Sequence, residues 1–148
     1  YVETIPDREI DPSRGYPILC SRSERGVVLP TVPLNYHVSG TAMWCTARAM
    51  VKCQAKLDEW RARDGFDGYM NLQVHDELVF DFPSRGDPTA DLANEKAGKL
   101  TIRTGKTSNL WRVRILQKLM EQSGENIGVP TPVSVEYHQT NWAEGKAV

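Results

Sequence analysis

One imidazole and two carboxylates lie together in His75-Asp76-Glu77, a polar triplet with strand-like sequence on both sides. Apolar and polar residues alternate before the triplet, and apolar residues return directly after it. This pattern predicts two paired strands over residues 70–82, joined by a tight turn that holds the triplet at its tip. Mg²⁺ prefers oxygen ligands, so Asp76 and Glu77 are the candidate metal ligands. An ordinary surface turn explains the same residues, because Asp is common in turns.

Two-metal chemistry at phosphorus needs a further carboxylate, because the two ions lie about 4 Å apart and share their ligands. Asp81 lies too far along the same predicted strand to serve. Asp7 and Asp11 lie in a turn-rich segment in which nothing is expected to fix them. The chain is therefore predicted to supply only half of such a site.

The remaining His and Cys residues predict no second site. His37, His75 and His138 are too scattered for a zinc-binding spacing. The three cysteines contain no CxxC pair, and their odd number argues against a disulfide framework. Cys45 and Cys53 lie in a helical pattern, where we expect them to pack as small apolar residues.

A long helix is predicted over residues 39–61, with Ser39 as its N-cap. Pro30 and Pro33 are expected to keep the preceding segment extended, so that no helix begins before Ser39. Arg48 lies off the apolar stripe of this helix and can reach a charged partner. The stripe consists of Met43, Ala47, Met50, Cys53, Leu57 and Trp60.

A second helix is predicted over residues 108–123, capped by Ser108 and stopped at Gly124. Its expected packing ridge is Trp111, Ile115 and Leu119. Its basic residues are expected on the remaining surface; they are Arg112, Arg114 and Lys118.

Short strands are predicted near both ends of the chain. Tyr1–Ile5 is an extended run, and Tyr16–Cys20 and Val27–Leu29 fit a hairpin. An alternating run within residues 132–137 predicts a closing strand that can join the sheet of the central hairpin, and residues 83–107 read as a loop. Strands and helices mix without regular βαβ alternation. The predicted fold class is therefore α+β, an antiparallel sheet packed against two main helices.

Length and composition set outer bounds on these predictions. A chain of 148 residues is expected to form one domain. Its formal net charge of -1 provides no overall basic signature, so any contact with nucleic acid must depend on local patches. The chain opens directly on strand-like sequence, which suggests a fragment or a processed piece. Without a signal peptide or a long apolar run, a cytoplasmic location is expected, in a bacterium or in the host of a phage.

Leu72–Phe80 has the sequence L-Q-V-H-D-E-L-V-F and resembles the third palm motif of family A DNA polymerases. This family includes the bacterial repair polymerase and many phage replicases. Asn35–Ala42 and Arg48–Met50 resemble the start of the family's long palm helix, and residues 132–142 resemble its closing strand and Asn-Trp pair. The pieces occur in the family's order. The resemblance therefore implies that residues 1–148 form the C-terminal part of a palm domain with a palm-type sheet.

The resemblance also implies roles for individual residues. Asp76 would be one of the two palm aspartates that hold two catalytic Mg²⁺ ions, with Glu77 as a supporting carboxylate. His75 would contact the primer strand near its 3′ end. The implied contacts with the primer–template duplex are Asn35, Ser39 and Arg48. The family usually has Gln where Ser39 lies, and Ser is too short to make the same contact directly.

Nothing in the chain resembles the family's other metal-binding Asp, or its fingers helix with a nucleotide-binding Lys and Tyr. The resemblance therefore implies that primer–template DNA and dNTPs are used only together with a further polypeptide. That polypeptide would carry the fingers, the thumb and the first palm Asp, and the isolated chain would be inactive. Two alternatives stay open: a non-catalytic descendant that binds DNA or protein, and an independent metal-dependent phosphohydrolase.

Overall fold

The computed structural model describes residues 2–18, 22–29, 31–83, 92–93, 96, 109–138 and 142–148. Within these ranges the chain has an α+β fold, which confirms the predicted class. The helices are α1 (Thr31–Asp64), α3 (Leu110–Glu125) and the short 3-10 helix η1 (Trp142–Glu144). The strands are β1 (Val2–Glu3), β2 (Pro17–Ile18), β3 (Tyr69–Val74), β4 (Glu77–Asp81), β5 (Glu136–Tyr137) and β6 (Lys146–Ala147).

α1 begins at Thr31, well before the predicted start at Ser39. Pro33 lies in its first turn, where backbone N–H groups have no partner within the helix, so a proline there loses no hydrogen bond. The expectation that Pro33 keeps its segment extended is therefore wrong, and Ser39 lies inside the helix. α1 ends at Asp64, and Gly65 follows it with φ 61°, the left-handed conformation common after helices.

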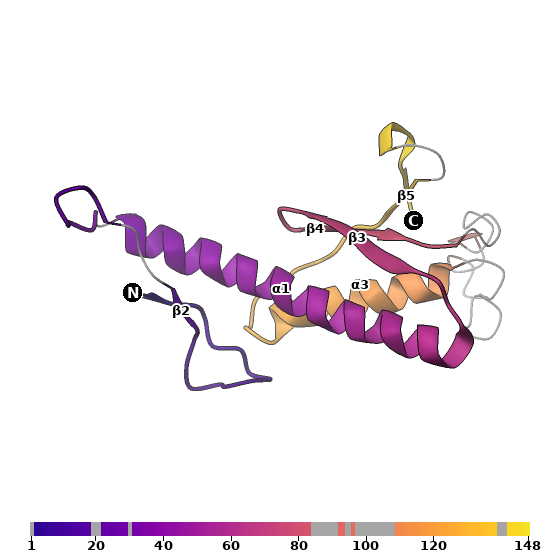
Figure 1. The fold of residues 1–148 in the computed structure, drawn as a ribbon, viewed down its shortest axis with the longest axis horizontal. Helices are drawn as coiled ribbons and strands as arrows, with labels where there is room; N and C mark the ends of the chain where they lie inside the picture. Colours follow the sequence, from indigo (N-terminus) through magenta and orange to yellow (C-terminus); the bar gives the residue numbers. More distant parts are fainter. Residues whose placement is uncertain are drawn as a thin grey trace.

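The core lies where the C-terminal half of α1 meets α3 and the β3–β4 hairpin (Figure 1). Its buried cluster consists of Cys53, Leu57, Trp60, Phe66 and Leu116. The hairpin adds partly buried side chains to this cluster, namely Met70, Phe80 and Phe82. Burial of a side chain as large as Leu or Phe contributes about 1.5–3 kcal/mol. This small cluster therefore accounts for much of the attachment of the hairpin to the helices.

The N-terminal half of α1 is less covered than the predicted stripe requires. Met43 is 59% exposed, whereas Cys53, Leu57 and Trp60 are buried as predicted. α3 runs beside α1 from Cys53, near Leu116, to Cys45, near Ser123. The apolar stripe of α1 extends beyond the part of the helix that α3 covers. The prediction that the stripe is buried is therefore correct only for the C-terminal part of the stripe.

α3 ends later than predicted, at Glu125. Gly124 does not stop the helix but lies buried inside it, where an added Cβ would be 2.6 Å from the carbonyl oxygen of Val129. The glycine thus permits the close return of the chain after the helix. Ser108, the predicted cap, lies outside the described residues, and Asn109 precedes α3 without a capping side-chain hydrogen bond.

Among the described residues, three two-stranded antiparallel sheets take the place of the single predicted sheet. β1 pairs with β2, whereas Val27 accepts a hydrogen bond from the Ser23 backbone in a local turn. β5 pairs with β6 and does not join the hairpin, because the last residues of the chain fold back onto it. Most of the predicted loop 83–107 lies outside the described ranges. No helix of the described part combines the length and apolarity that are needed to cross a membrane.

Candidate functional site

The candidate site is the turn between β3 and β4. The two strands pair in antiparallel register, and Val74 opposite Glu77 closes the hairpin around a turn of His75 and Asp76. His75, Asp76 and Glu77 are all exposed. The hairpin is therefore confirmed at its predicted place, and its catalytic role stays a prediction.

His75 has a backbone φ of 54°, in the left-handed region. A positive φ at a central residue is typical of two-residue hairpin turns, where Gly and Asn are usual. For a residue with a Cβ this conformation costs about 1–2 kcal/mol. The Gln73 side chain donates a hydrogen bond to the carbonyl oxygen of His75 and supports the turn. The histidine is thus held in an unfavourable backbone conformation at the exposed tip of the hairpin.

Asp76 and Glu77 supply carboxylate oxygens of the kind that Mg²⁺ binds, but they do not form a complete metal site. Among the described residues, no group of three or more His, Cys, Asp or Glu side chains is arranged to hold a metal ion. Asp81 lies opposite Tyr69 at the base of the hairpin, where it accepts a hydrogen bond from the Tyr69 hydroxyl at 3.1 Å. Asp76 and Glu77 could therefore hold a metal ion only together with further ligands.

Asp7 is held firmly, contrary to the expectation that nothing fixes it. It is 3% exposed, and its Oδ2 accepts a hydrogen bond from Trp44 Nε1 at 3.2 Å. Its Oδ1 accepts a hydrogen bond from the Glu9 backbone at 2.9 Å. The same Oδ2 lies 3.5 Å from Arg48 Nε. Asp7 therefore anchors the N-terminal segment to α1 and is committed to that contact.

Arg48 was predicted to contact the duplex, and the structure pairs it with the N-terminal segment. Its guanidinium lies 3.1 Å from Glu9 Oε2, in addition to its contact with Asp7. Lys52 Nζ lies 2.5 Å from the same Glu9 oxygen, and Asn126 donates to it at 2.8 Å. The hydrogen bond from Lys52 is the main cause that lowers the pKa of Glu9. Arg48 is thus part of a structural ionic cluster and is only 20% exposed.

Asn35 and Ser39 lie one turn apart on α1, and both are exposed. Together with Tyr36 and Gly40 they line a shallow hollow of about 200 Å³. The structure thus brings two of the predicted duplex contacts together on an accessible surface. Arg48 faces the N-terminal segment instead and does not share this hollow.

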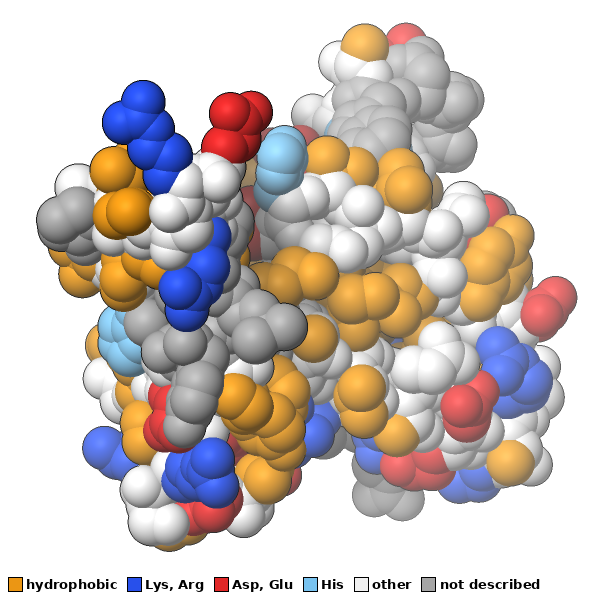
Figure 2. All heavy atoms as spheres, turned by 60° about the vertical axis from the view of Figure 1, so that its left-hand side comes forward, with side chains coloured by type: hydrophobic (Ala, Val, Ile, Leu, Met, Phe, Trp, Pro, Cys, Tyr) orange, Lys and Arg blue, Asp and Glu red, His pale blue; other side chains and the backbone are white. Residues whose placement is uncertain are grey.

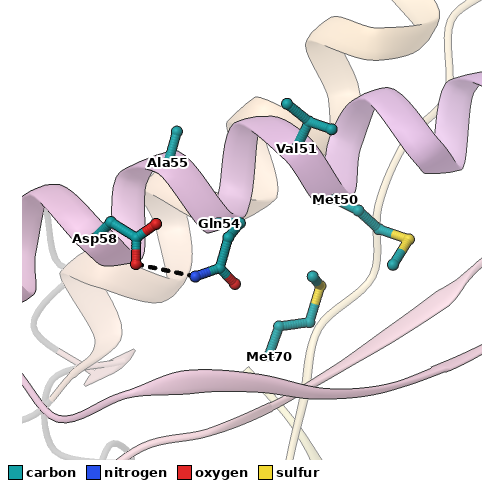
Figure 3. A pocket seen from close by; sticks show the side chains of 6 residues that line it. All are labelled: Met50, Val51, Gln54, Ala55, Asp58 and Met70. Atoms are coloured by element: carbon teal, nitrogen blue, oxygen red, sulfur yellow. Dashed lines mark hydrogen bonds between the residues drawn. The ribbon is translucent and has the colours of Figure 1, made fainter.

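A second hollow of about 410 Å³ lies between α1 and β3 (Figure 3). Met70 points from β3 toward α1, beside Met50, and Gln54 donates a hydrogen bond to Asp58 at 3.0 Å. Apolar side chains also gather across the middle of the face seen in Figure 2. With one carboxylate and mostly apolar walls, this hollow lacks the set of oxygen ligands that a Mg²⁺ site needs.

Arg112 is expected on the surface from the sequence, but the structure buries its side chain. Its side chain is 7% exposed, and its guanidinium carbon lies 4.1 Å from the centre of the Phe66 ring and 4.3 Å from that of Trp111. Trp60 is the third ring, at 5.5 Å. Only Trp111 is its neighbour in sequence, so the aromatic cage becomes visible only in the folded chain.

The described cysteines are structural, as predicted. Burial raises the pKa of the Cys53 thiol to about 12, and burial also raises the pKa of Cys45. Because the thiolate is the reactive form, Cys53 is not a nucleophile at neutral pH. Cys20 lies outside the described residues.

Comparison with known proteins adds no relative to this description. No family model, curated protein or solved structure matches the chain.

Proposed function

We propose that this chain is the C-terminal palm segment of a family A DNA polymerase. In this proposal it contributes one metal-binding carboxylate and contacts at the primer end to Mg²⁺-dependent nucleotidyl transfer. The observation that carries the proposal is the L-Q-V-H-D-E-L-V-F sequence of Leu72–Phe80, which resembles the third palm motif of that family. The exposed hairpin turn at His75-Asp76 supports it, because a carboxylate there is accessible to a metal shared with another polypeptide.

Each residue of the tip has a distinct proposed part. Asp76 holds the metal, Glu77 is a nearby supporting carboxylate, and His75 contacts the primer strand near its 3′ end. Mg²⁺ held at Asp76 would supply a Lewis acid that lowers the pKa of the primer 3′-hydroxyl and would offset negative charge on the leaving pyrophosphate. Asn35 touches the duplex near its minor groove and fixes register without reading sequence. Ser39 lies one turn further along α1 and is too short to make the contact of the family's Gln directly.

The remaining parts of the enzyme come from another polypeptide in this proposal. That polypeptide carries the fingers, the thumb and the first palm Asp, and the assembled enzyme uses primer–template DNA and dNTPs in the cytoplasm. Arg48 is left out of the duplex contacts, because its guanidinium is already bound to Asp7 and Glu9.

The substitution Asp76→Ala tests the proposal in the enzyme assembled with the polypeptide that carries the fingers. We expect primer extension to fall at least about 10³-fold, equivalent to about 4 kcal/mol of activation free energy, because a metal ligand is lost. Steady-state extension at saturating Mg²⁺ measures this change. Circular dichroism should show an unchanged fold, since Asp76 is exposed.

Asp81→Asn is the matched control, because it removes the charge of an exposed carboxylate from the same hairpin while its amide oxygen can still accept the hydrogen bond from Tyr69. Extension by this variant should equal that of the unmodified enzyme. Normal Mg²⁺-dependent extension by the Asp76→Ala variant would falsify the proposed metal role. If every assembly binds DNA but none extends a primer, the non-catalytic alternative is favoured instead.

A further inference from the structure

The segments that enter and leave the β3–β4 hairpin both lie against the buried side chain of Arg112 and its neighbours. The chain that leads into β3 passes through Asp64 and Phe66, and the Phe66 ring stacks on the guanidinium. Arg112 Nη2 lies 3.5 Å from Asp64 Oδ2. The segment before β3 therefore contacts the charge of Arg112 through Asp64 and the flat face of its guanidinium through Phe66.

Asn109 connects Arg112 to the segment that follows β4. Its side-chain amide donates a hydrogen bond at 2.8 Å to the carbonyl oxygen of Pro83, two residues after β4. Its amide oxygen accepts a hydrogen bond from Arg112 Nη1 at 3.1 Å. Phe82 also packs edge-on against Phe66, with ring centres 5.2 Å apart. One guanidinium thus connects the segments at which the hairpin starts and ends.

We propose that Arg112 is a positioning residue that sets the direction of the hairpin and hence the place of the Asp76 carboxylate, an inference that rests on the proposed function. Arg suits this role because its flat, forked guanidinium stacks on rings and donates in several directions at once. Lys lacks this geometry, and an apolar side chain lacks both the charge and the donors.

The length of the hairpin makes its base important for its tip. A six-residue strand such as β3 is about 20 Å long, at about 3.3 Å per residue. A rotation of about 5° at the base would then move the tip by nearly 2 Å by simple geometry. A misplacement of about 1 Å in an active site can cost about 10²-fold in rate. A loose base is therefore sufficient to impair chemistry at the tip.

The first test follows backbone hydrogen exchange in the isolated chain, without metal or DNA. In Arg112→Met, which keeps an apolar side chain of similar length, amides of β3 and β4 should exchange at least about tenfold faster. Amides around Cys53 and Leu57 should change much less, because their contacts with Leu116 remain. Arg112→Lys should lie between this variant and the unmodified chain.

Arg63→Met is the matched control, because Arg63 pairs with the same Asp64 carboxylate from the solvent side, at 2.7 Å. Its hairpin amides should exchange at the unmodified rate. Asn109→Ala provides a milder variant should Arg112→Met fail to fold, and it should loosen β4 more than β3. Unchanged hairpin exchange, or equal acceleration throughout both helices, would overturn the inference.

The second test measures primer extension by the assembled enzyme. For Arg112→Met we expect kcat to fall about 10²-fold with an unchanged KM for dNTP, and Arg112→Lys should recover part of the loss. An unchanged kcat alongside faster hairpin exchange would overturn the positioning role. If the unmodified assembly never extends a primer, the proposed function fails, and the positioning role fails with it. The exchange result then still reports the anchoring separately.

Discussion

His75 adopts a backbone conformation that glycine reaches more easily. Glycine, however, has no side chain that could form a hydrogen bond at the tip of the hairpin. Replacing it with Gly would relieve about 1–2 kcal/mol of backbone strain. The greater flexibility of Gly in the unfolded chain would cost about 0.5–1 kcal/mol of that gain. Strain at an exposed turn of this kind is common where a side chain is retained for function.

We therefore expect His75→Gly to raise the free energy of unfolding by about 0.5–1 kcal/mol while lowering primer extension by the assembled enzyme. Urea unfolding monitored by circular dichroism measures the first change. His75→Asn is a useful comparison, because Asn tolerates the left-handed region and should also stabilise the turn. A loss of stability in both variants would show that the His75 side chain itself supports the fold.

At the residue scale, the sequence predicts contacts between neighbours better than contacts made by the fold. Alternation around the triplet predicts the hairpin and its tip, because each strand needs only its adjacent partner. The buried states of Asp7 and Arg112 depend on Trp44, Phe66 and other distant residues. No local pattern marks these two charges as buried, so both were expected on the surface or in an unfixed loop.

At the scale of elements, the N-terminal segment is attached to both helices through Glu9. This carboxylate binds Arg48 and Lys52 of α1 and Asn126, which follows α3. The hydrogen bond from Lys52 holds the pKa of Glu9 below its ordinary value of 4.5. A carboxyl group with a lowered folded-state pKa stabilises the fold above its unfolded-state pKa. That contribution is lost as the pH falls through the folded-state pKa.

We therefore expect Glu9→Gln to lower the free energy of unfolding at pH 7 by at most about 1 kcal/mol, because solvent screens this half-exposed cluster. The difference from the unmodified chain should shrink as the pH falls from 4.5 through the lower folded-state pKa of Glu9, because protonation then leaves a neutral group in both proteins. Urea unfolding between pH 3 and 7 tests this. Glu125→Gln, at another exposed carboxylate, serves as the control. A difference that is independent of pH would contradict the assignment.

The periodicity of apolar residues predicts the existence of both helices but not their limits. The start of α1 depends on the tolerance of a first helical turn for Pro33. The end of α3 depends on the approach of Val129 to Gly124, which only the folded chain reveals. Helix limits are therefore decided by the termini and their tertiary contacts rather than by the pattern inside the helix.

At the scale of the whole molecule, the candidate metal site is one-sided. The α+β class follows from the mixture of helical and strand-like patterns in the sequence. The division into three sheets depends instead on which of the short strands near the ends of the chain pair with each other. Under the proposed function, a two-ion site forms only when a second carboxylate is added to Asp76.

We therefore expect the isolated chain to bind Mg²⁺ weakly, with a dissociation constant above about 1 mM, or less than about 4 kcal/mol of binding free energy. Titration calorimetry of the unmodified chain and of the Asp76→Ala variant, under identical conditions, tests this. Saturable binding of two ions well below 1 mM would count strongly against the proposal and in favour of an independent metal-dependent phosphohydrolase.

The β3–β4 ribbon also bears on self-association. In the described part of the chain, neither strand has a partner on its outer edge, and such edges can pair with strands of neighbouring copies. The register of β3 shifts between Met70 and Leu72, and this irregularity interrupts the flat ladder that identical copies would need for stacking. The carboxylates of Glu77 and Asp81, at the two ends of β4, add repulsion between like strands. The hairpin is thereby protected against aggregation while its edges remain open.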